Sequence, residues 1–83
     1  MGMELLDRAV PLPLRRPHPG LGLVVLRSGM TRVTRRDGEV LGYVEPIDDG
    51  RYRAKRLVTR RAQFRLIGDF WTADEALDAL RYV

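Results

Sequence analysis

Cysteine is absent from this 83-residue chain, so neither a disulfide nor a thiolate metal site can stabilise the fold. Histidine occurs once, as His18 between two prolines, which is a poor setting for a metal site or a general base. The apolar run 21–26 is far shorter than the ~18 residues of a membrane span, and it is too short and too late for a signal sequence. We therefore expect a cytoplasmic protein with no membrane segment and no cofactor.

Catalytic residue patterns are also scarce. The single serine, Ser28, precedes a glycine in a turn-like pair, and the carboxylates at 48–49 suit a turn. Those at 74–78 suit a helix start and its solvent side. Acid–base catalysis needs carboxylates in contrasting environments around a cleft, and these carboxylates all suit exposed positions. A glycine-rich phosphate-binding loop is also absent from the sequence. The sequence predicts that the protein is not an enzyme and takes no small-molecule substrate.

Charge is distributed unevenly along the chain. The formal net charge is +4 with a pI near 10.3, and fourteen of the fifteen basic residues are arginine, as a GC-rich genome would also favour. Seven basic residues and no acid occupy 51–65, whereas four acids and one arginine occupy 66–83. Such polarity attracts a polyanion to one side of the molecule.

At this length a single core has a thin stability margin, so the domain folds compactly or relies on a partner.

Proline marks the first boundary. Four prolines fall within 11–19, which predicts a partly extended, solvated arm over 1–20. The remaining residues, 21–83, form one domain. The run 21–26 is typical of a strand buried on both faces.

Turn signals divide the next part of the chain into strands. Ser28-Gly29, Asp37-Gly38 and Asp48-Asp49-Gly50 predict three hairpin turns, the second of type I′ with Asp37-Gly38 at its centre. In the strand 39–45 we expect Val40, Gly42 and Val44 on one face, and Leu41 and Tyr43 on the other. The strands expected around these turns are 21–26, 30–36, 39–45, 51–58 and 63–67.

A helix is predicted to close the chain. Thr72 and Glu75 form a capping box, and Trp71 is placed to pack against Ala76. Apolar residues then recur at steps of three and four, which gives one apolar stripe. The fold class is therefore α+β: an antiparallel β-meander of three to five strands packed against one C-terminal amphipathic helix.

The predicted strand 51–58 carries the strongest functional signal. Side chains alternate along a strand, so Arg51, Arg53 and Lys55 share one face. Cations spaced about 6–7 Å apart roughly match the rise between phosphates along a nucleic-acid strand, and arginine can bind the guanine edge in a major groove. We predict a nucleic acid, first of all duplex DNA, as the partner; the alternative is a solvated face that prevents edge aggregation. The residues expected to add phosphate contacts from flanking turns are Arg32, Arg35, Arg36, Arg60 and Arg61.

Two stretches, 50–54 and 66–80, carry a resemblance to known DNA-binding modules. They are similar to the DNA-binding domain of plant ethylene-response factors and to the arm-site-binding N-terminal domain of tyrosine integrases. The shared pattern is a strand G-x-aromatic-x-A, followed by L-G-x-F-x-T-x-x-E-A at the helix entry. The resemblance implies a three-stranded sheet on one helix that reads a major groove. With the hypothesis of nucleic-acid binding goes an expected origin in a phage or other mobile element. The matching residues are Gly50, Tyr52, Ala54, Ile67, Gly68, Phe70, Thr72, Glu75 and Ala76.

The same resemblance exposes departures from the family pattern. In its register Phe64 and Leu66 face the groove, where the families tend to have a cation and an aromatic, and Arg65 points inward. Tyr43, Phe64 and Leu66 together suggest an apolar face that the run 21–26 or a second protomer covers. The sequence therefore leaves a second hypothesis open: a protein-binding adaptor or inhibitor, such as a phage protein acting on a host factor, or a homodimer. A structural accessory domain is the third.

Overall fold

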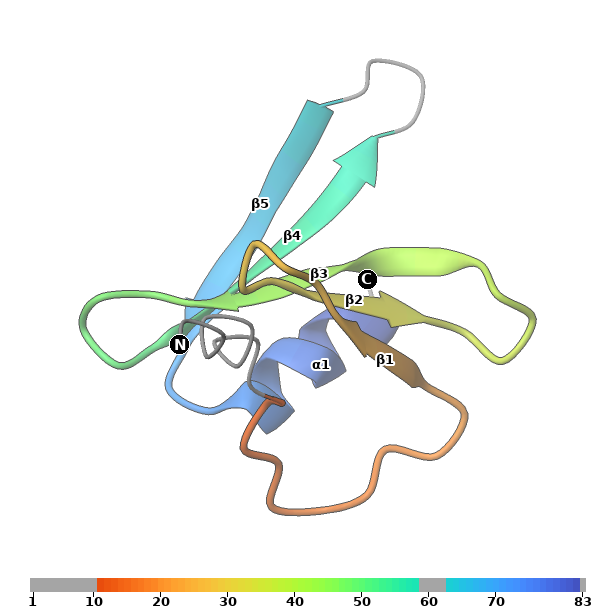
Figure 1. The fold of residues 1–83 in the computed structure, drawn as a ribbon, viewed down its shortest axis with the longest axis horizontal. Helices are drawn as coiled ribbons and strands as arrows, with labels where there is room; N and C mark the ends of the chain where they lie inside the picture. Colours follow the sequence, from red (N-terminus) through yellow and green to blue (C-terminus); the bar gives the residue numbers. More distant parts are fainter. Residues whose placement is uncertain (1–10, 59–62, 83) are drawn as a thin grey trace, which may run out of the picture.

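A computed structural model describes residues 11–58 and 63–82 (Figure 1). Five strands run in a meander of order β1-β2-β3-β4-β5, and every neighbouring pair is antiparallel. One helix follows them, which confirms the predicted α+β meander with a C-terminal helix. The elements are β1 (Gly22–Val25), β2 (Thr31–Thr34), β3 (Val40–Pro46), β4 (Tyr52–Val58), β5 (Gln63–Phe70) and α1 (Ala73–Arg81).

The first three hairpins turn in the same way. In each, a glycine with φ between +85° and +97° donates its N–H to the carbonyl three residues earlier: Gly29, Gly38 and Gly50. The residue before each glycine accepts a bond from the backbone two positions on, as Asp37 does from the Glu39 N–H at 2.9 Å. The positions of the three turns are as predicted. The type I′ assignment is wrong, because the bond from Gly38 to Arg35 places residues 36–37 at the centre of the turn.

A β-bulge changes the expected alternation in β3. Val33 pairs with Gly42 and Thr34 pairs with Val40, so Leu41 is an extra residue between two paired positions. Leu41 consequently points into the core and is 2% exposed, whereas Val40 is 41% exposed. The prediction that Leu41 shares a face with Tyr43 is therefore wrong, since strict alternation does not hold across a bulge.

The helix α1 packs against one face of β3, β4 and β5. Its capping box is formed: the Glu75 N–H donates to Thr72 Oγ1 at 3.1 Å, and the Thr72 N–H donates to Glu75 Oε1 at 3.2 Å. Trp71 is 70% exposed, so its expected packing role against Ala76 is wrong. The buried core consists of Val33, Leu41, Val44, Ala54, Ala76, Leu77 and Leu80.

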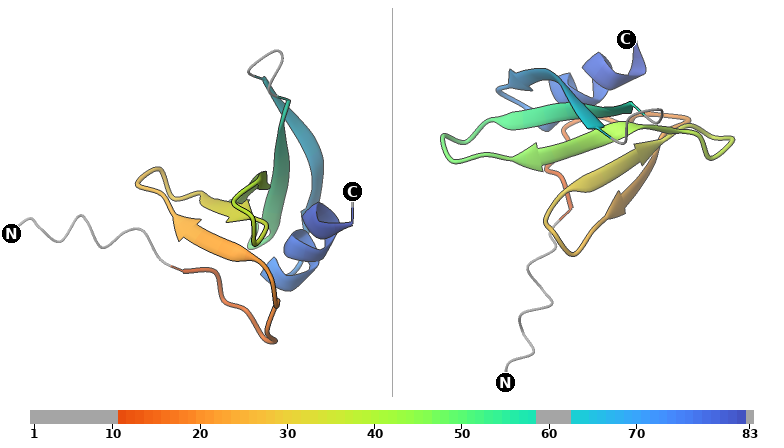
Figure 2. Two further views of the ribbon diagram at one scale, coloured as in Figure 1. Left: turned by 90° about the vertical axis from the view of Figure 1, so that its right-hand side faces the viewer. Right: turned by 90° about the horizontal axis from the view of Figure 1, so that it is seen from above.

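Two expectations about the N-terminal part are corrected. β1 lies at the edge of the sheet, with Leu23 and Val24 36% and 49% exposed, so it is not buried on both faces and does not cover the sheet. The described part of the arm is docked, because Leu12 and Leu14 pack against the core. Figures 1 and 2 show this segment passing the start of α1 before it enters β1.

The sheet is strongly bent. In Figure 2 the β1–β2 and β4–β5 hairpins diverge, and α1 lies against the outside of the bend. The far ends of β4 and β5 project beyond the helix, which explains why Arg65 is exposed although its position points to the helix side of the sheet. The sheet surface turned away from α1 is therefore the inside of the bend.

Candidate nucleic-acid interface

The sheet surface turned away from α1 lines the inside of the bend, and it is here called the outer face because it points away from the helix and the core. It carries one row of side chains from all five strands. The cross-strand register aligns Val24, Arg32, Tyr43, Lys55 and Leu66. Along β2, β3 and β4 this row alternates with the buried residues Val33, Val44 and Ala54, so alternation directs it away from the helix. The outer face thus mixes cations with aromatic and aliphatic groups.

Arg53 and Lys55 lie on the outer face, as their spacing predicts, and each meets a carboxylate. Arg53 donates to both oxygens of Asp69, from Nε at 2.8 Å and from a terminal nitrogen at 3.0 Å. Lys55 Nζ lies 2.7 Å from Glu45 Oε2. The hydrogen bonds from Arg53 lower the pKa of Asp69, so this acid stays ionised. The two ion pairs reduce the positive charge that a partner would meet.

Arg51 stands at the start of β4 and is also paired. Its guanidinium donates to Asp49 at 2.8 Å, and this bond lowers the pKa of the Asp49 carboxyl. The central carbon of this guanidinium lies 5.2 Å from the centre of the Trp71 ring. The Arg51 charge is therefore shared between a carboxylate and an aromatic face.

Three aromatic rings each have a cation beside them. Besides the Trp71 ring, the Arg32 guanidinium lies 5.9 Å from the Tyr43 ring, and Lys55 Nζ lies 5.6 Å from the Phe64 ring. Tyr43 and Phe64 meet edge to face at 5.4 Å. Phe64 is 49% exposed and Trp71 70% exposed. These rings offer partly uncovered π surfaces, which are the surfaces on which nucleic-acid bases stack.

Arg35 and Arg36, two of the other predicted phosphate contacts, do not lie on this surface. They lie in the β2–β3 turn, at the opposite end of β3 from Arg51. Arg60 and Arg61 lie outside the described residues. Of the predicted set, Arg32, Arg53 and Lys55 share the outer face, with Arg32 and Lys55 on either side of Tyr43.

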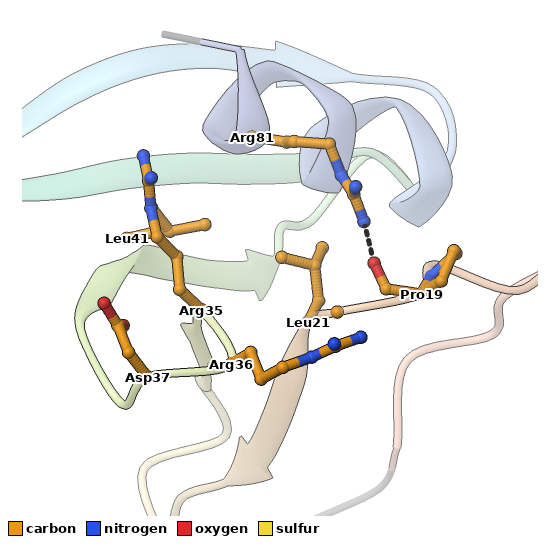
Figure 3. A pocket seen from close by; sticks show the side chains of 8 residues that line it. Pro19, Leu21, Arg35, Arg36, Asp37, Leu41 and Arg81 are labelled. Carbon is orange, nitrogen blue, oxygen red and sulfur yellow. Dashed lines mark hydrogen bonds between the residues drawn. The ribbon is translucent and has the colours of Figure 1, made fainter.

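Arg35 and Arg36 instead line an open hollow of about 370 Å³ (Figure 3). Arg81, from the end of α1, borders the same hollow and donates a 2.7 Å hydrogen bond to the carbonyl of Pro19. The labelled guanidinium groups point in different directions and do not converge on one point. The hollow therefore lies where the arm, the β2–β3 turn and the end of α1 meet, and its rim is positively charged.

A buried His–Asp pair was missed by the sequence reasoning. His18 Nε2 lies 2.7 Å from Asp74 Oδ1, and its Nδ1 lies 3.8 Å from Asp78 Oδ1, with the ring side chain 3% exposed. Hydrogen bonding from His18, together with the backbone N–H groups of Arg15 and Arg16, lowers the pKa of Asp74. Both ring nitrogens face carboxylates and the ring is buried, so the pair holds the arm and offers no nitrogen to a substrate. Nothing in the local sequence pairs these positions.

Within residues 11–58 and 63–82, no group of three or more acidic, histidine or cysteine side chains is placed to hold a metal ion. In the same residues, α1 is too short to cross a membrane, and there is no other helix. Comparisons with protein-family models, with curated proteins and with solved structures found no match.

Proposed function

We propose that the protein binds nucleic acid through the outer face of its sheet. The observation that carries the proposal is a set of three aromatic rings, the partly buried Tyr43 and the exposed Phe64 on the outer face and the exposed Trp71 just beyond β5, each with a cation within 6 Å of its centre. Stacking on aromatic rings and attraction of phosphates to cations are the two interactions that nucleic-acid-binding sheets combine. The net charge of +4 adds a general attraction for polyanions.

The proposal includes the expected source, a phage or other mobile element, and a cytoplasmic location where nucleic acid is accessible. It includes no catalytic role. The outer face carries three cations, Arg32, Arg53 and Lys55, against two carboxylates, Glu45 and Asp69. Because charge alone is modest there, the aromatic rings have to supply a large part of the binding.

The test is fluorescence anisotropy with labelled oligonucleotides in single-stranded and duplex form. We expect binding that weakens as salt rises from about 50 to about 200 mM. The logarithm of the binding constant should fall by about 0.7–0.9 for each log unit of salt concentration and each phosphate contact. The double variant Arg32→Gln, Lys55→Gln should bind more weakly and with a shallower salt slope. The matched control, Arg35→Gln with Arg36→Gln, removes the same charge from the β2–β3 turn, away from the outer face, and should keep the slope. Equal binding by the two double variants, or no binding at low salt, would refute the proposal.

A protein partner is the second candidate, because aliphatic residues share the outer face. Leu66 is 58% exposed and Val24 49% exposed, so a partner that covers the outer face would bury apolar surface at both edges of the sheet. A second copy of the chain or a host factor would cover them. Light scattering tests for a homodimer. If a second copy covers this face, the unaltered protein should be a dimer and the Leu66→Lys variant a monomer.

A further inference from the structure

We infer that the outer face, together with the Arg51–Trp71 pair just beyond the end of β5, binds unpaired nucleotides, in DNA or RNA, by stacking bases on Phe64 and Trp71, and does not read a duplex groove. This inference rests on the proposed function and names its ligand class. It departs from the major-groove reading that the sequence resemblance implies.

The ion pairs argue against a duplex. In groove reading, Arg53 and Lys55 would be the central contacts, yet Arg53 binds both oxygens of Asp69 and Lys55 binds Glu45. To contact a guanine edge or a phosphate, each cation would have to leave its carboxylate. The two carboxylates would then face the duplex, whose phosphates repel them. Bending a stiff double helix locally to avoid them costs free energy, whereas a flexible single strand can follow the cations alone.

Trp71 has the geometry of a stacking platform. The Arg51 guanidinium lies 5.2 Å from the ring centre, and 70% of the residue surface still meets solvent. Arg51 is itself fixed by Asp49 through two bonds, one from its backbone N–H at 3.2 Å and one from Nε at 2.8 Å. A ring with a positioned cation beside it and most of its surface open can accept a base.

Phe64 forms the second platform. Its ring is held edge to face against Tyr43, and Lys55 Nζ lies 5.6 Å from its centre. Phe64 pairs with Leu57, and Phe70, the residue before Trp71, pairs with Tyr52. The two platforms are therefore about six strand positions apart, or roughly 20 Å at the rise of a strand. That separation gives each ring its own base. Arg53 lies between them, where the backbone of the bound strand would pass.

Charge distinguishes this ligand from a protein partner. The core of a protein–protein interface is depleted in charged residues, whereas each exposed ring here stands beside a lysine or arginine. A base stacked on the ring with a phosphate beside the cation satisfies both groups. An apolar protein segment would cover the ring and leave the cation desolvated.

The experiment compares labelled dT and rU oligomers of about twelve nucleotides, a usual site size, with a duplex of equal length. We expect the single strands to bind at least tenfold more tightly than the duplex. Phe64→Ala and Trp71→Ala should each weaken single-strand binding roughly tenfold or more. The control is Tyr82→Ala, which removes an aromatic ring that is 79% exposed but lies at the end of α1; it should bind as the unaltered protein does.

Trp71 is the only tryptophan, so its fluorescence gives an independent reading. Stacked bases should quench it in the unaltered protein, and Phe64→Ala should require more oligomer for the same quenching. Tighter dT or tighter rU binding identifies the source of the nucleotides, and either supports stacking. Duplex binding as tight as single-strand binding, or unchanged affinity in both ring variants, overturns the inference while leaving nucleic-acid binding in place. No binding to any of the three oligomers would overturn both.

Discussion

The Nε2 atom of His18 lies 2.7 Å from Oδ1 of Asp74, although 56 positions separate the two residues in the chain. Asp74 is in the first turn of α1, where a negative charge is favoured by the helix dipole, and it also accepts the backbone N–H of Arg15 at 3.0 Å. One carboxylate therefore joins the arm to the helix that closes the core. The arm is thus an integral part of the domain.

The first prediction concerns this carboxylate. Asp74→Asn should lower the urea midpoint of unfolding markedly, because the amide cannot accept from both His18 and the Arg15 N–H as a carboxylate does. Asp78→Asn makes the same chemical change one turn later, where the side chain is 37% exposed and pairs with Arg16. It should shift the midpoint much less, since exposed ion pairs contribute little. Equal midpoints for the two variants would contradict the role assigned to Asp74.

The second prediction concerns the loss of folding stability at low pH. Asp74, Asp69 and Asp49 have pKa values lowered from 3.8 by hydrogen-bonded partners, the largest cause being His18, Arg53 and Arg51 respectively. Their contribution to stability is complete above pH 3.8 and is lost as the pH falls through the folded-state values, because the unfolded chain then binds more protons. Urea unfolding followed downward from pH 5 should show this loss.

In Asp74→Asn the loss of stability with acid should be smaller than in the unaltered protein. A pH dependence with the same slope in both proteins would show that Asp74 has no lowered pKa.

The third prediction tests the close approach at Gly42. A Cβ there would lie 2.3 Å from the Lys55 carbonyl oxygen and 2.7 Å from a methyl group of Leu80. Gly42→Ala should cost about 1–3 kcal/mol or more, since the backbone has to move. Val40→Ala, two residues earlier at a 41% exposed position, is the control and should cost much less. Chemical denaturation of both variants measures the difference, and a stable Gly42→Ala protein would count against the observed packing of β3 on β4 and α1.

The fourth prediction concerns the helix start. Thr72→Ala removes the hydroxyl that accepts the Glu75 N–H and should destabilise the protein by about 1 kcal/mol. Thr72→Ser keeps the hydroxyl and should restore most of that stability. Thermal unfolding followed by circular dichroism checks both, and a serine variant as unstable as the alanine variant would show that the methyl group, not the cap, matters.

Local residue chemistry was sufficient to predict the hairpins and the helix. A glycine after serine or aspartate places each turn, because a left-handed backbone there favours glycine, and Thr72 with Glu75 fixes the helix start through bonds within one turn. The pairing of Arg53 and Lys55 with carboxylates was not predictable in the same way. Asp69 and Glu45 come from the neighbouring strands, and their positions depend on register and on a bulge between Ala54 and Lys55 in the β4–β5 pairing.

The sequence by itself therefore determined the order of the elements, the three glycine turns and the helix cap, since each depends on residues a few positions apart. Only the tertiary structure decided that Leu41 enters the core, that the proline-rich arm docks through His18, and that the cations of β4 stand beside acids and aromatic rings. Each of these depends on contacts between residues that are distant in the chain, and such contacts form only once the strands have paired and the helix has packed.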